Sequence, residues 1–159
     1  MSERIPCGGL VEKGDHALVE VLGFVPKPGR PCGILELFGR AGIALSYLSV
    51  GRDAGGLTGM SFCVRTDELA RHRLILDEVR RRYDPRTVTA TAPVVILTLY
   101  GPHFLERTSL ACQVFGALCS GGLEPHTVAS SVNSISAVVD THVRDAAVAC
   151  LRETFTWPE

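Results

Sequence analysis

The chain of 159 residues contains an internal repeat, and this repeat limits the possible fold more than any other feature. Residues 34–43 match residues 114–123 when 80 is added to each number. Apolar residues coincide at 34/114, 35/115, 38/118 and 43/123, and a glycine coincides at 42/122. An apolar stretch precedes each copy, at residues 17–22 and 94–99, and a short one follows each, at residues 60–64 and 135–139. We therefore expect two copies of one small unit.

Local signals predict a helix within each repeat. In the first copy the helix begins after Pro28 and Gly29 and ends at Gly42, the usual places for proline and glycine at helix ends. In the second copy it begins at Thr108 and Ser109, either of which can cap a helix through its hydroxyl group.

A second helix follows in both halves. Thr66 precedes Asp67 and Glu68 in the first half, which predicts a cap and two carboxylates at the positive end of the helix dipole. In the second half, apolar residues spaced by four predict one apolar face, and they are Val143, Ala147, Leu151 and Phe155. Middle strands are expected at residues 44–51 and 125–131.

Each half therefore has the order β-α-β-β-α-β, which is the ferredoxin-like pattern of an α+β fold. We expect a four-stranded antiparallel sheet in each half, with both helices on one face. The first domain is predicted at residues 15–83 and the second at 90–156, with a linker at 83–86. Residues 7–11 are predicted to form a short extra strand, followed by a turn at 13–15. We expect this N-terminal strand, with bounds of about residues 5–12, to belong to the second domain.

The size of each half predicts how the halves associate. A unit of about 65 residues is marginally stable alone, so the two copies are expected to pack side by side. We expect one continuous or closely paired sheet of about eight strands, and a homodimer that covers a remaining edge or helix face.

Composition excludes several classes of function. Lys and Arg total 16 against 17 Asp and Glu, so no net positive charge is present to attract nucleic acid. No apolar run is long enough to cross a membrane, and the N-terminus has no apolar signal region. The six cysteines form no CxxC pair, which favours reduced thiols and a cytoplasmic location. No metal spacing, cofactor motif or catalytic constellation is visible, so we expect no enzymatic activity.

These elements carry a resemblance to a known family. Lys27-Pro28-Gly29 before the first helix and Ala41-Gly42-Ile43 after it resemble the ACT domain, and the tandem resembles the regulatory region of aspartokinases. The second half is the nearer match, through residues 123–140, 145–148 and 151–155, and residues 8–11 resemble the strand that precedes the first ACT unit in that family. The likeness covers residues 7–155 and lacks the kinase part.

The resemblance implies a regulatory role. Tandem ACT domains of this family bind amino acids such as lysine or threonine at interfaces between ACT units and shift a kinase domain between states. The chain is then expected to be a free-standing regulatory subunit, or a regulatory domain of a longer kinase, that binds a small amino acid effector. A kinase catalytic subunit is a candidate partner.

Recognition of an amino acid needs donors for its carboxylate and acceptors for its ammonium group. The N-terminus of the first helix offers backbone N–H groups beside Lys27, Pro28, Gly29 and Arg30, and Arg30 adds a charge. The carbonyl groups of the middle strand are candidate acceptors, at Ala44, Leu45 and Ser46. The matching residues of the second half are Thr108, Ser109, Glu124, Pro125 and His126.

Three kinds of side chain that contact effectors in the family are replaced, at four positions of this sequence. Pro26 stands where an acid precedes Lys-Pro-Gly, Ala44 and Glu124 stand where an asparagine follows the helix, and Val50 stands where a glutamine ends the middle strand. The alternative interpretation is therefore an ACT-type module that mediates dimerisation or interaction without binding a ligand.

Overall fold

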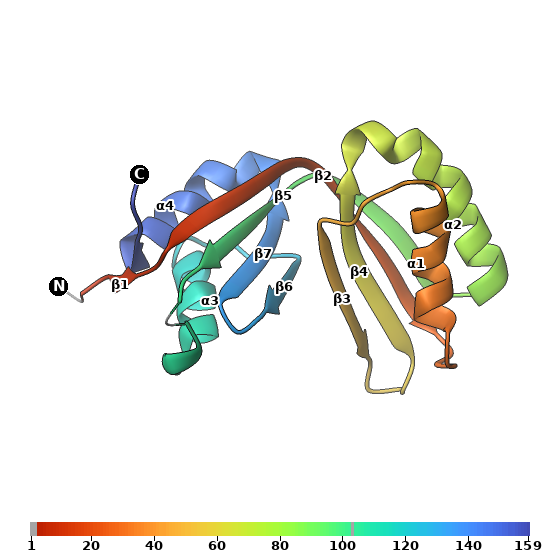
Figure 1. Ribbon diagram of the computed structural model, residues 1–159, viewed down its shortest axis with the longest axis horizontal. Coiled ribbons are helices and arrows are strands. Elements are labelled where there is room, and N and C mark those ends of the chain that lie inside the picture. The colour runs from red at the N-terminus through yellow and green to blue at the C-terminus, as the bar shows by residue number, and fades with distance from the viewer. Residues whose placement is uncertain (1–2, 103) are drawn as a thin grey trace. The chain divides into compact units, whose positions relative to one another are not determined.

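The computed structural model describes residues 3–102 and 104–159, and over these residues the fold is a mixed α/β fold (Figure 1). Its helices are α1 (Arg30–Arg40), α2 (Leu69–Tyr83), α3 (Leu110–Ser120) and α4 (Arg144–Thr154). The strands of the main sheet are β2 (Gly9–Phe24), β3 (Tyr47–Arg52), β4 (Thr58–Arg65), β5 (Thr87–Tyr100), β6 (Thr127–Ser130) and β7 (Ser134–Asp140). Two short strands, β1 (Ile5–Pro6) and β8 (Phe155–Thr156), pair in parallel as a second sheet.

The chain divides into two compact units. The first unit comprises residues 1–14 and 94–159, and the second comprises residues 15–93. The strand order is β3-β4-β2-β5-β7-β6, and both β2 and β5 run through both units. The segment at residues 83–86, expected to be a linker, lies inside the second unit between α2 and β5.

The core of the second unit lies between its sheet and one pair of helices. Alternate residues of β2 and β4, among them Val19 and Phe62, are buried against Ile34 and Phe38 of α1. The rings of Phe38 and Phe62 meet edge to face, with centroids 4.9 Å apart. The helix α2 adds Leu76 and Val79 to the same cluster. Both helices therefore cover one face of this sheet.

The first unit repeats this arrangement with other residues. Leu97 of β5 and Ala137 of β7 are buried with Leu118 of α3 and with Ala147 and Leu151 of α4. The spacing by four that the sequence shows along α4 is therefore the buried face of this helix.

The boundary of the first strand differs from the sequence prediction. The predicted turn at residues 13–15 is wrong, because β2 continues without interruption from Gly9 to Phe24. Asp15 does adopt a left-handed conformation, at φ 55°, and pairing with β4 begins at the next residue, where His16 pairs with Arg65. The carbonyl group of Asp15 accepts a hydrogen bond from the Thr66 hydroxyl at 3.1 Å, which ties this residue to the end of β4.

The predicted helix cap at Thr66 is wrong, because its hydroxyl donates to Asp15 and α2 has no side-chain cap. The caps predicted at Thr108 and Ser109 are wrong as well, because α3 has no side-chain cap and Ser109 stands before it in a left-handed conformation. The expected sheet of eight strands is a sheet of six, because β2 and β5 each serve both units.

Within the described ranges, no helix is long and apolar enough to cross a membrane. The same residues contain no group of three or more His, Cys, Asp or Glu side chains that could hold a metal ion. His103, which the sequence shows among five histidines, lies outside the described residues.

Candidate functional site

The direction of the strands decides which parts of the second unit meet. Both β2 and β3 pair antiparallel with β4, so β2 and β3 run in the same direction. Phe24 at the end of β2 and Arg52 at the end of β3 both pair with Thr58 of β4. The loop that leaves β2 and enters α1 therefore lies beside the end of β3, not beside its beginning.

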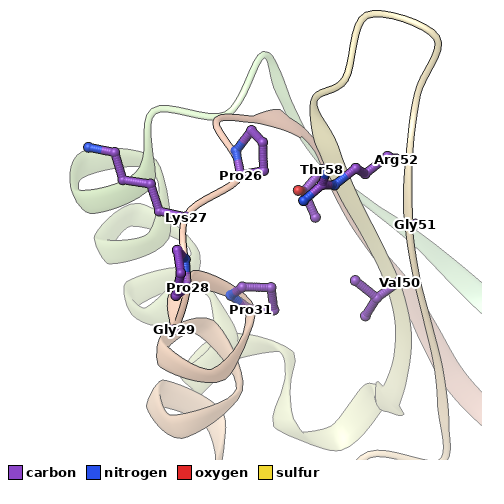
Figure 2. A pocket seen from close by; sticks show the side chains of 9 residues that line it. All are labelled: Pro26, Lys27, Pro28, Gly29, Pro31, Val50, Gly51, Arg52 and Thr58. Atoms are coloured by element: carbon purple, nitrogen blue, oxygen red, sulfur yellow. The ribbon is translucent and has the colours of Figure 1, made fainter.

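A cavity of about 530 Å³ occupies this corner (Figure 2). Its walls come from the loop before α1, from the first turn of that helix and from the end of the β3–β4 hairpin. The lining residues are Pro26, Lys27, Pro28, Gly29, Pro31, Val50, Gly51, Arg52 and Thr58. The volume lies in the range that is usual for small-molecule sites.

The charged side chains of this cavity point in different directions. Figure 2 shows the Lys27 side chain turned away from the space between the helix and the strand, whereas the Arg52 side chain extends toward it beside Thr58. Within the described residues, no hydrogen bond or ion pair engages the Arg52 guanidinium group. A cation without a partner among these residues therefore faces a space whose other walls include three prolines and Val50.

The N-terminus of α1 offers fewer donors than its sequence predicts. Gly29 precedes the helix at φ 83°, in the left-handed region. The Arg30 N–H donates to the Lys27 carbonyl oxygen at 3.2 Å, and the Gly33 N–H donates to the Gly29 carbonyl oxygen at 2.8 Å. Pro31 has no N–H group. Most donors of the first turn are thus already used or missing.

The predicted residues of the middle strand lie at the other end of this unit. Ser46 stands six residues before Arg52 on an extended chain, a separation of about 20 Å at 3.3 Å per residue. The Ser46 N–H donates to the Cys63 carbonyl oxygen, and its hydroxyl lies 2.8 Å from Nε2 of His16. Leu45 packs against the core, and Ala44 is exposed. Within one unit the structure therefore does not bring residues 44–46 beside residues 27–30.

The first unit has a smaller cavity at the matching place. It measures about 300 Å³ and lies between the start of α3 and the turn that joins β6 to β7. Its lining residues are Phe104, Arg107, Ser109, Leu110, Ala111, Ser130, Ser131, Val132 and Ile135. Ser109 thus lines this cavity, whereas Thr108 precedes it without lining the space.

Glu124, Pro125 and His126 stand before β6, at the opposite end of that strand from the cavity. The His126 N–H donates to the Val138 carbonyl oxygen at 2.8 Å. Its Nε2 atom lies 2.9 Å from Oδ1 of Asp140, at the end of β7. These contacts place His126 at the sheet edge of its unit.

The sequence pointed to Val50 through the resemblance, but it gave no indication of the other strand-end residues of the two cavities. Arg52 and Thr58 flank a glycine-rich turn, and the sequence there indicates a hairpin but no binding site. The parallel direction of β2 and β3 could have located them, because it places the end of the middle strand beside the start of the helix.

The comparisons with known proteins agree on the fold. No family model and no curated protein sequence matches this chain. Among solved structures, the regulatory subunit of aspartate kinase from Thermus flavus is 19% identical, with a TM-score of 0.84 over 94% of this chain and 99% of that one. A structure of aspartokinase alpha and beta subunits is 20% identical, with a TM-score of 0.82 over 93% of this chain and 97% of that one.

A third structure is E. coli aspartokinase III in complex with lysine and aspartate, in its T-state. It is 14% identical, with a TM-score of 0.72, and the match covers 98% of this chain and 35% of that one. At these identities the likeness establishes the fold, and it confirms the resemblance drawn from the sequence at that level. The chain has the fold of the regulatory region of aspartate kinases.

Proposed function

We propose that this chain is an amino-acid-binding regulatory protein built from two ACT domains of ferredoxin-like order. In this proposal the domains span residues 15–83 and 90–156, with the N-terminal strand added to the second. One observation carries it: cavities stand at matching corners of the two units, each between the start of a helix and the end of an edge strand.

The proposed role is regulatory, as for the effector-binding region of aspartate kinase. Binding of an amino acid to one state of an assembly stabilises that state, and the same free energy is then available to change a partner's activity. The E. coli enzyme that shares the fold was solved with lysine and aspartate, which supports an amino acid as the class of ligand.

The proposed partners are a second copy of this chain and a kinase catalytic subunit. β3 is an edge strand of the sheet, and its Leu48 and Val50 side chains are 44% and 46% exposed. Exposed apolar edge strands favour pairing with another chain, which supports a homodimer. The structure of aspartokinase alpha and beta subunits supports a kinase partner.

A thermal shift screen of the twenty amino acids at millimolar concentration tests this function. An amino acid at one hundred times its Kd stabilises the folded chain by about 2.7 kcal/mol, so its melting temperature rises measurably. If no amino acid raises the melting temperature, the proposed ligand binding is overturned.

A second candidate is an interaction module that binds no ligand. The use of N–H groups at the start of α1 by neighbouring carbonyls favours it. A negative screen together with a stable dimer in sedimentation velocity supports this candidate. Leu48→Lys is then expected to convert the dimer to a monomer, whereas the same change at exposed Leu74, on α2, leaves the dimer intact.

A further inference from the structure

We infer that the cavity of the second unit selects an L-amino acid with a short uncharged side chain, whose carboxylate is bound by Arg52. This inference rests on the proposed function and names the class of ligand and the residue that discriminates. It concerns the cavity between the start of α1 and the end of β3 (Figure 2).

The first step is the anchor for the carboxylate. At the start of α1, two backbone N–H groups already donate to carbonyl oxygens, and Pro31 has none to donate. The Arg52 guanidinium group is the cation that extends toward the space, and Lys27 turns away from it (Figure 2). Asp53, the next residue, forms no ion pair with Arg52 in the part of the chain that the structure describes, and its Oδ1 atom accepts the Leu57 N–H at 2.9 Å. Arg52 therefore binds the carboxylate by charge-assisted hydrogen bonds.

The second step is the ammonium group. Thr58 is directly opposite Arg52 in the β3–β4 register, and its side chain is 6% exposed. Both residues line the cavity. A hydroxyl oxygen can accept a hydrogen bond from an ammonium group. The pair of Arg52 and Thr58 thus provides one partner for each charged group of an amino acid.

The third step is the side chain of the ligand. The remaining walls are largely apolar and include Pro26, Pro31 and Val50. None of the described residues that line the cavity is acidic. A lysine ligand would bring its second ammonium group into a space that holds a cation and no carboxylate, and a dicarboxylate would find its second charge without an equivalent partner. A short apolar side chain fills the space without this cost.

Isothermal titration calorimetry on the full chain tests the inference with matched probes. L-valine retains the carboxylate that L-valinamide lacks, and L-lysine and L-aspartate each add one charge. We expect L-valine to bind at least about tenfold more tightly than the other three. Equal affinity for L-lysine or L-valinamide would overturn the inference while leaving amino acid binding intact. Failure of every amino acid to bind would overturn the proposed function as well.

Two variants separate the role of Arg52 from general charge. Arg52→Gln is expected to weaken L-valine binding by about tenfold or more. Arg73→Gln removes the same charge from an exposed site on α2, outside the cavity, and is expected to leave the affinity unchanged. Circular dichroism and the melting temperature without ligand establish that both variants fold. If folded Arg52→Gln binds L-valine as the unmodified chain does, the assignment of Arg52 is wrong.

Discussion

The two cavities occupy the same corner of two similar units, yet their chemistry differs. With the offset of 80 residues, Gly29 corresponds to Ser109, Lys27 to Arg107, Val50 to Ser130 and Arg52 to Val132. Both cavities have a cation in the loop before the helix, Lys27 and Arg107. The larger cavity has a second cation, Arg52, at the strand end, whereas the smaller one has the hydroxyl groups of Ser130 and Ser131 there.

The backbone at these corners is nevertheless the same. Gly29 and Ser109 both precede a helix in the left-handed region, at φ 83° and φ 66°. Each carbonyl group accepts the N–H of the residue four positions later, at 2.8 Å and 3.0 Å. The repeat has thus kept the geometry that the fold requires, while the side chains that a ligand would contact have diverged. Functions of the two units should therefore be tested separately.

The largest expected effects come from the two cores. Phe38 of α1 and Leu118 of α3 are matched by the repeat and are both fully buried. Phe38→Ala is expected to lower the free energy of unfolding by about 3–5 kcal/mol, and Leu118→Ala by about 2–5 kcal/mol. Because β2 and β5 run through both units, we expect each variant to destabilise both units together. Urea unfolding followed by hydrogen exchange measures this, and full protection retained in one unit would contradict it.

The next largest effect is on ligand-induced stabilisation, which should depend on the larger cavity and not on the smaller one. Arg52→Val gives the larger cavity the residue that the smaller one has at this place. With a saturating amino acid present, we expect the variant to lose about 1.5–3 kcal/mol of ligand-induced stabilisation, the value of hydrogen bonds to a charged group. Without ligand its stability should change by less than about 0.5 kcal/mol, because Arg52 is exposed. The matched control is Val132→Ala in the first unit, and an equal loss there would place the ligand in the other cavity.

The sequence predicted the repeated pattern well and the cavities less well. Periodic apolar residues such as Leu97 and Leu118 locate the elements, because burial on one face depends on local spacing. The positions of Ser46 and Arg52 depend on the direction of β3, which pairing with β4 sets and which no local signal contains. The strand β2 was predicted as two pieces because Gly14 and Asp15 are typical turn residues, while sheet pairing holds them in one strand.

A smaller effect tests the shared backbone before each helix. Nothing lies within 4 Å of a side chain built at Gly29, so Gly29→Ala should cost about 1–2 kcal/mol through its left-handed conformation alone. The reverse change, Ser109→Gly, removes the same strain from the first unit and should raise the free energy of unfolding by about 0.5–1 kcal/mol. Thermal unfolding of both variants provides the measurement. A lower free energy of unfolding in Gly29→Ala and a higher one in Ser109→Gly would support a shared left-handed backbone before the two helices. A loss of stability in Ser109→Gly would contradict it.

The smallest expected effect is that one helix of the second unit loses hydrogen-exchange protection at a higher pH than its counterpart in the first unit. His72 and Leu76 are buried and spaced by four on α2, as Ala147 and Leu151 are on α4. The His72 ring packs against Phe38, and no hydrogen bond to its ring nitrogens is present within the described residues.

Burial lowers the pKa of His72; Arg71 adds to this direction, and the carboxylates of Glu68 and Asp67 oppose it. The folded state then binds the proton less readily than the unfolded chain, so the contribution to stability is fully present above about pH 6.5. It is lost as the pH falls from there through the lowered pKa of His72 in the folded state. Protonation of His72 favours local opening of α2, which does not require either unit to unfold. Hydrogen exchange between pH 7.5 and pH 5 should therefore show α2 losing protection before α4. His72→Leu is expected to remove this difference, whereas His142→Gln, at an exposed histidine of the first unit, should leave it unchanged. If α2 and α4 lose protection together in the unmodified chain, the buried histidine does not set the acid response of its unit.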